Sequence, residues 1–289
     1  AVTTGSSAGF VLAFLSAFDE GARVALTNPG YPCYRQVMKT LGMTPLAIRT
    51  RAAQNWMPSR EDLLRAGEGA LDGVILASPA NPTGTMLTPD ELKILIETTQ
   101  EMGGLYISDE IYHGLSYENR DHSALEFSDD VIVINSFSKY YCMTGWRIGW
   151  MVLPQSLTRT VERLIQNLYI SAPTLSQYAA IAAFDATDDL ERVKAVYRQN
   201  RDLLLTELPR AGFTKLVPAS GAFYLYADIR DFSDNSYEFA KTMLAKTGIS
   251  ATPGLDFDPV NGKAYLRFSF AGRADEIAEA AKRLKIWLG

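Results

Sequence analysis

The sequence predicts an α/β protein in which a three-layer α/β/α domain with a mostly parallel sheet precedes a smaller C-terminal α+β domain. The first observation behind this prediction is that short β-branched runs alternate with segments of helical periodicity. Strands that alternate with helices typically form a parallel sheet covered on both faces. The second observation is a long helical pattern from about Leu157, followed by a mixture of strands and helices. We therefore expect domains at residues 1–195 and 196–289.

Six β-branched runs are expected to form the strands of the first domain. They are Arg23–Thr27, Thr44–Arg49, Gly73–Ala77, Leu105–Ser108, Val131–Asn135 and Ile148–Leu153. The clearest helix is expected at Pro89–Met102, where apolar residues recur at helical spacing. Its start is well marked, because Thr88 supplies a capping hydroxyl and Glu91 occupies the third helical position. An earlier helix is expected to open at Gly5–Gly9 and to run to Phe18.

The second domain is expected to follow a long helical segment that runs from Leu157 through Thr174 to about Leu208. The elements expected beyond it are strands at Phe213–Val217, Ala222–Ile229 and Ala264–Phe270, and helices at Tyr237–Thr247 and Ala274–Leu288.

Charge and composition exclude several classes of protein. With 28 Lys and Arg against 33 Asp and Glu, the net charge is −5, so no broad basic field is available for nucleic acid. Two cysteines and two histidines supply no zinc cluster, and so few cysteines are typical of a reducing compartment. The longest apolar stretch, Gly9–Phe18, is too short to span a bilayer. We expect a cytoplasmic protein with no metal, membrane or nucleic-acid partner.

Candidate functional residues follow the expected strands, and parallel sheets bind ligands outside the carboxyl ends of their strands. Ser6 and Ser7 lie in the segment that opens the first helix, where free N–H groups and the helix dipole can attract an anion. Taken alone, this segment is more simply explained as an N-cap. Tyr31, in the turn Asn28–Pro32, can offer its ring face to a flat heterocycle or merely pack in its loop.

Two further loops carry polar groups. Asn81 lies between two prolines in the loop Ser78–Gly84, which can position its amide or simply form a turn. Asp109 follows the strand Leu105–Ser108 and precedes Tyr112 by three residues. A carboxylate there can pair with a cationic ring nitrogen while the Tyr hydroxyl reaches another atom of the same ring. Such acid and Tyr pairs are common, so neither loop is decisive alone.

The most specific segment is Ser136-Phe137-Ser138-Lys139, which ends a strand among apolar and aromatic residues. Desolvation there lowers the pKa of the Lys139 amine and frees it for Schiff-base formation, which makes a plain surface Lys a poor explanation. Arg147, eight residues on, can contact a phosphate through two hydrogen bonds. Arg267 lies within the apolar run Leu266–Phe270. Because a buried guanidinium is costly unless paired, it needs a protein or substrate carboxylate.

Together these residues supply what pyridoxal phosphate (PLP) chemistry on amino acids requires. The sequence resembles a class I aminotransferase of PLP fold type I over nearly its whole length. The motifs that carry the resemblance are Thr4-Gly5-Ser6-Ser7, Asn28-Pro29-Gly30-Tyr31-Pro32, Asn81-Pro82-Thr83-Gly84, Asp109-Glu110-Ile111-Tyr112, Ser136-Phe137-Ser138-Lys139, Thr144-Gly145-Trp146-Arg147 and Arg267. The Ser-x-Ser-Lys run followed by Thr-Gly-Trp-Arg is the most specific of them.

The resemblance implies ping-pong transamination between an amino acid and a 2-oxo acid, with three catalytic residues. Lys139 is expected to be the Schiff-base lysine and to move a proton between the substrate α-carbon and the cofactor. Asp109 is expected to keep the pyridine nitrogen protonated. Tyr112 and Asn81 are expected to hydrogen-bond the phenolic oxygen of the ring.

The remaining roles concern binding. The resemblance implies that Tyr31 stacks on the cofactor ring and that Arg267, with Asn81, binds the substrate and its α-carboxylate. The residues expected to hold the phosphate are Ser6, Ser7, Ser136, Ser138 and Arg147. A dicarboxylate-specific enzyme needs a second Arg for the distal carboxylate. If Ser171 and Pro173 align with the corresponding loop of aspartate aminotransferases, Asn167 occupies that position, which favours neutral or aromatic substrates.

The first five residues read as the end of a strand that runs into a helix, and the chain does not begin with Met. We therefore expect an N-terminal segment to be missing. The resemblance implies that this segment covers the substrate and lends a phosphate-binding Tyr to the neighbouring subunit of a homodimer. We expect the chain to fold and dimerise but to be weak or inactive as a catalyst, which a comparison with an upstream-extended chain would test.

Two other functions are compatible with parts of the pattern. A PLP-dependent lyase or synthase of the same fold would use the same Lys139 and Asp109, because a shared fold does not determine the reaction. Analysis of the products separates these activities. A non-catalytic ligand-sensing domain of a transcription regulator is disfavoured, because such domains usually vary the Asn-Pro-Thr-Gly and Asp-Glu-x-Tyr segments that are intact here.

Overall fold

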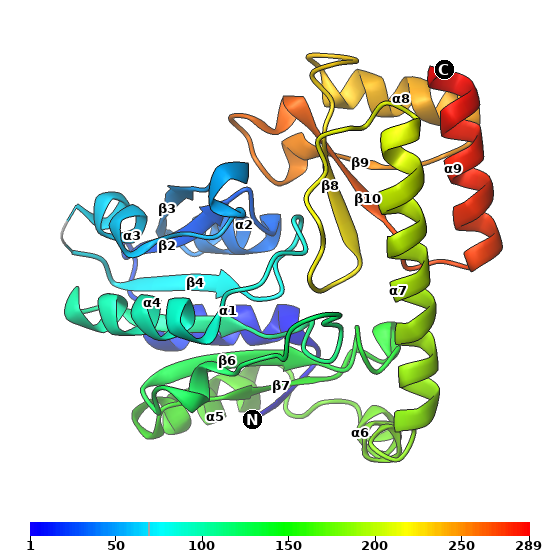
Figure 1. Ribbon diagram of the computed structural model, residues 1–289. Helices are drawn as coiled ribbons and strands as arrows, with labels where there is room; N and C mark the ends of the chain where they lie inside the picture. Colours follow the sequence, from blue (N-terminus) through cyan, green and yellow to red (C-terminus); the bar gives the residue numbers. More distant parts are fainter. Residues whose placement is uncertain (69) are drawn as a thin grey trace.

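The computed structural model describes residues 1–68 and 70–289, and its larger sheet confirms the predicted α/β class (Figure 1). Seven strands follow the order β1-β7-β6-β5-β4-β2-β3. Their bounds are β1 Val2–Thr3, β2 Arg23–Asn28, β3 Thr44–Arg49, β4 Gly73–Ala77, β5 Leu105–Asp109, β6 Val131–Ser136 and β7 Gly149–Val152. Strands β2 to β6 run parallel, whereas β7 pairs antiparallel with β6 and β1 pairs antiparallel with β7.

Helices cover both faces of this sheet and make three layers. On one face lie α1 (Ser6–Ala17), α2 (Pro32–Thr40) and α5 (Gln155–Leu168), and on the other lie α3 (Arg60–Gly67) and α4 (Pro89–Glu101). The alternation of side chains along β2 explains the division. Val24 and Leu26 pack under α1 and α2, while Ala25 points to the opposite core with α3 and α4. The predicted cap of α4 is present, since Thr88 and Glu91 form both hydrogen bonds of a capping box.

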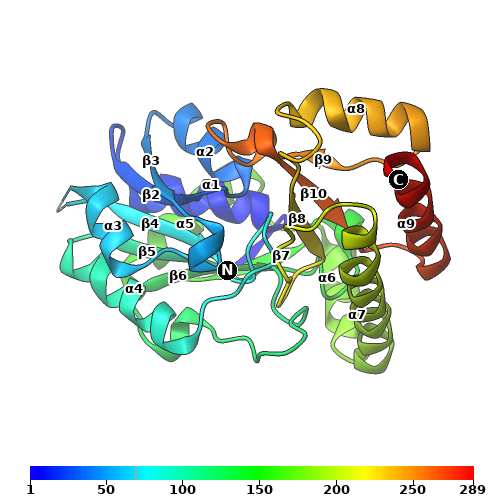
Figure 2. The ribbon, with the colours of Figure 1, turned by 45° about the horizontal axis from the view of Figure 1, so that its top comes forward.

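The C-terminal part of the chain forms a second, antiparallel sheet with the strand order β8-β10-β9, to one side of the large sheet (Figure 2). Its strands are β8 Tyr224–Asp228, β9 Thr252–Pro253 and β10 Tyr265–Ser269. Helices α8 (Ser236–Thr247), α9 (Ala274–Leu288) and the end of α7 (Thr187–Arg210) enclose a separate core with this sheet. The predicted division between residues 195 and 196 falls inside α7 and stays a prediction.

Two predictions for this region were wrong. The long helical segment breaks into α5, α6 (Thr174–Ala183) and α7. The break between α5 and α6 arises because the residue before Pro173 is disfavoured in a helix and Ile170 adopts a positive φ of 68°. The strand expected at Phe213–Val217 is reduced to one isolated bridge between Leu216 and Ala227. Pro218 follows this segment and has no N–H group to continue a ladder.

The short elements were not predicted either, since α2, α3 and the 3-10 turns are too brief to show a clear period. The 3-10 turns are Ala52–Gln54, Ala124–Glu126, Thr144–Trp146, Gly254–Asp256 and Gly262–Ala264. None of the helices in the described part of the chain is both long and apolar enough to cross a bilayer. The arrangement sets the carboxyl ends of β2, β4, β5 and β6 at one edge of the large sheet, facing the small sheet.

Candidate active site

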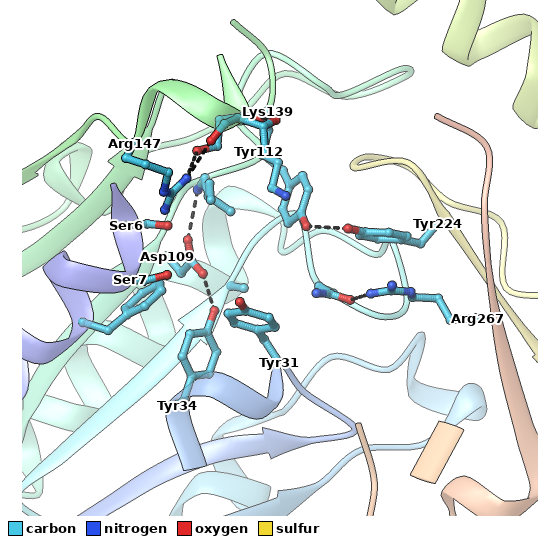
Figure 3. Close-up of a pocket in the computed structure, with 16 residues that line it drawn as sticks. Ser6, Ser7, Tyr31, Tyr34, Asp109, Tyr112, Lys139, Arg147, Tyr224 and Arg267 are labelled. Carbon is cyan, nitrogen blue, oxygen red and sulfur yellow. Dashed lines mark hydrogen bonds between the residues drawn. The ribbon is translucent and has the colours of Figure 1, made fainter. Parts of the chain in front are cut away.

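A cavity of about 300 Å³ lies at this edge, between the large sheet and strands β8 and β10 (Figure 3). Of the eleven residues that the sequence singled out, ten line it: Ser6, Ser7, Tyr31, Asn81, Asp109, Tyr112, Ser138, Lys139, Arg147 and Arg267. Four lining residues have charged side chains: one is the carboxylate of Asp109, and three are the cations Lys139, Arg147 and Arg267. The cavity is therefore suited to a ligand that carries negative charge.

The amino end of α1 is left open toward the cavity. Gly5 occupies the N-cap position with φ 88°, and no side chain caps the helix. A Cβ at Gly5 would lie 2.5 Å from Nη2 of Arg147, so only glycine allows this guanidinium so close to the helix end. Nη1 of Arg147 donates to the carbonyl of Thr144 at 2.8 Å and lies 3.3 Å from the Ser138 hydroxyl. The helix N–H groups and Arg147 thus form a cradle for an anion.

Ser136 is the predicted site residue that does not line the cavity. Its buried hydroxyl lies 3.0 Å from the carbonyl of Ile148 and accepts a hydrogen bond from the Ser138 N–H at 3.1 Å. These bonds hold the loop that carries Ser138. Within the described residues the Ser136 hydroxyl faces the carbonyl of Ile148 and does not line the cavity, so its expected contact with a phosphate stays a prediction.

Asp109, at the end of β5, is almost fully buried. One carboxylate oxygen accepts the N–H of Ile111 at 3.0 Å, and the other accepts a short hydrogen bond from the hydroxyl of Tyr34. Burial raises the pKa of Asp109 to about 6, while these two hydrogen bonds oppose that rise. Both oxygens are thereby oriented before any ligand arrives.

Lys139 points into the cavity from the loop after β6 (Figure 3). Its Nζ lies 5.8 Å from the ring centre of Tyr112 and 5.6 Å from that of Phe223. Burial lowers the pKa of Lys139, and the nearby guanidinium of Arg267 lowers it further. A larger share of the amine is therefore neutral, and so nucleophilic, than for a Lys in water.

Arg267 enters the cavity from β10, with its guanidinium between the rings of Tyr224 and Phe257. The ring centres lie 4.1 and 4.6 Å from Cζ. Nη1 donates to Oδ1 of Asn81 at 2.7 Å, and Nη2 donates to the Thr252 hydroxyl at 3.2 Å. Its Nε is buried and has no partner among the described residues. The predicted need for a carboxylate is therefore not met by the neutral partners that hold this side chain.

The contact with Arg267 also determines the orientation of Asn81. A guanidinium can only donate hydrogen bonds, so the Asn81 atom that faces it is the carbonyl oxygen. The amide nitrogen must then point away from Arg267, and its two hydrogens remain available to an acceptor in the cavity.

A family model with the description "Aminotransferase class I and II" matches residues 1–284 of this chain. The chain belongs to the class I and II aminotransferases. This enzyme is therefore a PLP-dependent aminotransferase, which transfers an amino group between an amino acid and a 2-oxo acid.

Relatives support the same assignment. The aminotransferase is 45% identical to a valine–pyruvate aminotransferase of Mycobacterium tuberculosis, over 99% of this chain and 75% of the relative. It is 35% identical to a (5-formylfuran-3-yl)methyl phosphate transaminase of Methanocaldococcus jannaschii, over 99% of this chain and 74% of the relative. The crystal structure of an aminotransferase from M. tuberculosis superposes with a TM-score of 0.97 at 45% identity, covering 99% of this chain and 75% of that one.

A more distant solved structure is the aspartate aminotransferase of Thermus thermophilus with maleate. It superposes on this aminotransferase with a TM-score of 0.93 at 27% identity, covering 99% of this chain and 75% of that chain. The predicted PLP fold type I architecture is confirmed by this similarity.

The residues of this aminotransferase fit PLP on three structural observations. The open end of α1 beside Arg147 suits a phosphate, the oriented carboxylate of Asp109 suits a ring nitrogen, and the Lys139 amine that points into the cavity suits a carbonyl carbon.

Three residues at the site were missed by sequence reasoning. Tyr34 bonds Asp109, Tyr224 packs on Arg267, and Thr252 accepts from Arg267. Tyr34 stands three residues after Tyr31, and this spacing in a helix start could have placed both rings near the same strand end. Tyr224 and Thr252 depend on how the small sheet docks, for which the sequence contains no local pattern.

The buried charge of Asp109 leads to a stability prediction for the PLP-free enzyme. The folded pKa of about 6 lies above the unfolded value of about 3.9, so the native state binds the proton more tightly. The Asp109 carboxyl therefore contributes fully to the free energy of unfolding of the wild type at low pH, and this contribution is lost as the pH rises through about 4 to 6. At pH 8, Asp109→Asn should therefore be more stable than wild type by about 3 kcal/mol, or about 6–12 °C in Tm.

Thermal unfolding of PLP-free wild type and Asp109→Asn between pH 4 and 8 tests this prediction. Asparagine keeps both hydrogen bonds, because its oxygen can accept from Ile111 and its nitrogen can donate to Tyr34. The advantage of the variant should shrink as the pH falls. A variant less stable than wild type at pH 8 would contradict the account.

Proposed function

We propose that the cavity is the active site of the aminotransferase, with Lys139, Asp109 and Tyr112 as its catalytic residues. The observation that carries this proposal is the convergence, in one cavity, of an amine whose pKa is lowered by burial, a buried carboxylate and an Arg to which the described residues supply no carboxylate. The residues proposed to hold PLP are Ser6, Ser7, Tyr31, Asn81, Asp109, Tyr112, Ser138, Lys139 and Arg147. When bound, PLP supplies an electron-withdrawing ring that stabilises negative charge at the substrate α-carbon.

Lys139 has two tasks in this proposal. Its Nζ would hold the cofactor covalently, and as a base it would take the proton from the substrate α-carbon and return it at a carbon of the cofactor. Both tasks need a neutral amine, and burial together with the positive charge of Arg267 supports that state. Asp109 keeps a proton on the ring nitrogen, for which its Tyr34 and Ile111 bonds orient the carboxylate.

Arg267 is proposed to bind the α-carboxylate shared by amino-acid and 2-oxo-acid substrates. The rings of Tyr224 and Phe257 and the polar contacts with Asn81 and Thr252 hold its guanidinium in place before the substrate binds. A fixed guanidinium orients the substrate as well as attracting it, which places the α-hydrogen for removal by Lys139.

The side chain of the preferred amino acid is proposed to be neutral and aliphatic. Three cations among the described residues line the cavity, namely Lys139, Arg147 and Arg267. Each already has a role in holding the cofactor or the α-carboxylate, so none is left to bind a distal carboxylate. Asn167, considered earlier for distal-carboxylate recognition, lies on α5 and donates to the carbonyl of Arg163 outside the cavity lining. The name of the 45% identical relative, a valine–pyruvate aminotransferase, supports the same substrate class.

Amino-group transfer to pyruvate by the PLP-loaded enzyme tests this function and its specificity. We expect kcat/KM for valine to exceed that for aspartate by about tenfold or more, because a neutral pocket leaves the distal carboxylate unpaired. Identification of the 2-oxo acid product separates transamination from the lyase or synthase alternative. Faster reaction with aspartate would overturn the neutral-substrate proposal.

We also propose that two copies of the chain associate through the face formed by α6 and the segment before it. Apolar side chains are exposed there, namely Ile170, Leu175, Tyr178, Ile181 and Phe184. Beside them lies an apolar cavity of about 490 Å³, whose lining includes Phe137 and Trp150. A surface of this kind supports association, and a twofold pair is the commonest arrangement. A cytoplasmic location and a biosynthetic role stay predictions.

Light scattering of the purified chain tests the homodimer. Wild type should have twice the mass of one chain, and Ile181→Glu should lower the mass toward that of one chain because a charge is buried without a partner. Ile286→Glu is the matched control, since Ile286 is 73% exposed on α9 against 65% for Ile181 on α6. A wild-type mass of one chain would contradict the proposal.

A further inference from the structure

We propose that Tyr224 is a positioning residue, whose hydroxyl turns the Tyr112 proton toward the cofactor and whose ring holds Arg267 for the substrate carboxylate. This inference rests on the proposed roles of Tyr112 and Arg267. Tyr224 was not among the residues that the sequence singled out, and it touches both of these groups at once (Figure 3).

The geometry places Tyr224 between two residues of different roles. Its buried side chain projects from β8, and its hydroxyl lies 2.9 Å from that of Tyr112, which follows β5 in the large domain. Cζ of Arg267 lies 4.1 Å from the centre of the Tyr224 ring. Arg267 stands on β10, which pairs antiparallel with β8. One side chain therefore links the carboxylate-binding Arg to the Tyr assigned to the cofactor ring.

Counting hydrogens defines what the Tyr224 hydroxyl does. Each of the two hydroxyls has one proton, and either can donate to the other. If Tyr112 donates to Tyr224, Tyr112 presents only lone pairs to an anionic oxygen in the cavity. If Tyr224 donates, the Tyr112 proton is free to bond that oxygen. A phenolic oxygen that bears negative charge therefore favours the arrangement in which Tyr224 donates to Tyr112. The hydrogen bond from Tyr224 then strengthens the one that Tyr112 donates to the phenolic oxygen.

The amide of Asn81 is likewise oriented by a second residue. Its oxygen is occupied by Arg267, which leaves its N–H groups for the cavity. Both proposed donors to the phenolic oxygen, Tyr112 and Asn81, thus have their donor atoms directed by a second residue. Tyr224 directs the first, and Arg267, supported on the Tyr224 ring, directs the second.

Tyr224→Phe tests the hydroxyl, because it keeps the ring and the contact with Arg267. The readout is the pKa obtained from the pH dependence of the absorbance of the Lys139-linked cofactor. Loss of the Tyr224 donor weakens stabilisation of the phenolic anion, so the linked nitrogen keeps its proton to higher pH. We expect this pKa to rise by about 0.3 unit, less than the rise caused by Tyr112→Phe.

The double variant distinguishes positioning from packing. In a Tyr112→Phe background the Tyr224 hydroxyl has no proton to direct, so adding Tyr224→Phe should leave the pKa unchanged. An equal shift in both backgrounds, or no shift in either, would overturn the inference. If wild type itself shows no absorbance band that borohydride fixes at Lys139, the proposed function fails instead.

Tyr224→Leu tests the ring. Calorimetric titration of the PLP-free enzyme with pyruvate should show about fivefold weaker binding for Tyr224→Leu, because the aromatic face under Arg267 is lost, and unchanged binding for Tyr224→Phe. Circular dichroism shows whether the Leu variant is folded, and the Phe variant keeps the test decisive if it is not. Equal binding by folded Tyr224→Leu and wild type would remove the second half of the proposal.

Discussion

Replacement of Lys139 with alanine should abolish transamination and prevent covalent attachment of PLP to the chain. The variant removes the nucleophilic amine and the group that moves the α-proton, so we expect the rate to fall by at least about 10⁴-fold. PLP should still bind non-covalently, because Arg147 and the open end of α1 remain. Steady-state rates and the mass of the borohydride-treated protein measure the two effects.

Chemical rescue makes this test specific to the amine. A small primary amine added to Lys139→Ala can enter the space left by the side chain and restore part of the proton transfer, whereas it cannot repair a misfolded protein. Lys282→Ala is the matched control, because Lys282 is exposed on α9. Retained activity in Lys139→Ala, or attachment of the cofactor at another Lys, would show that Lys139 has been assigned wrongly.

The sequence allowed prediction of those parts of the site that are determined within one strand and the loop after it. Asp109 ends a parallel strand, Asn81 and Lys139 lie in the loops after two others, and the topology brings such positions to one edge. The motif Ser136-Phe137-Ser138 did not indicate which of its two hydroxyls lines the cavity. Ser138 lies in the loop after β6 and lines the cavity, whereas the hydroxyl of Ser136, the last residue of β6, lies against the carbonyl of Ile148.

The parts of the fold that the sequence did not predict are those decided by contacts between distant segments. Val217 has strand-like neighbours, yet its segment keeps only one bridge because Pro218 follows and Phe213 is buried in the second core. The pairing of Tyr112 with Tyr224 joins residues 112 positions apart, and that of Asn81 with Arg267 joins residues 186 positions apart. Neither contact produces a local periodicity or a biased composition in the sequence, so both were found only in the structure.

Arg267→Lys should weaken the reaction of α-amino acids by about 100-fold in kcat/KM while it leaves cofactor attachment at Lys139 intact. The change preserves the positive charge but removes the planar fork, which can give a carboxylate two parallel hydrogen bonds. It also loses the contacts with Asn81 and Thr252, so an ammonium there would not be held in one place. Loss of such a charged hydrogen-bonded pair costs about 3 kcal/mol, which corresponds to about 100-fold.

A substrate without the carboxylate separates recognition from general damage to the site. Isobutylamine keeps the side chain and amine of valine but offers Arg267 nothing to bind, so wild type and Arg267→Lys should react with it equally slowly. Arg273→Lys serves as the matched control, because Arg273 is exposed at the start of α9 and pairs with Asp275. If Arg267→Lys slows isobutylamine as much as valine, Arg267 acts through the shape of the cavity. If only valine is slowed, the guanidinium between Tyr224 and Phe257 is the carboxylate receptor of this aminotransferase.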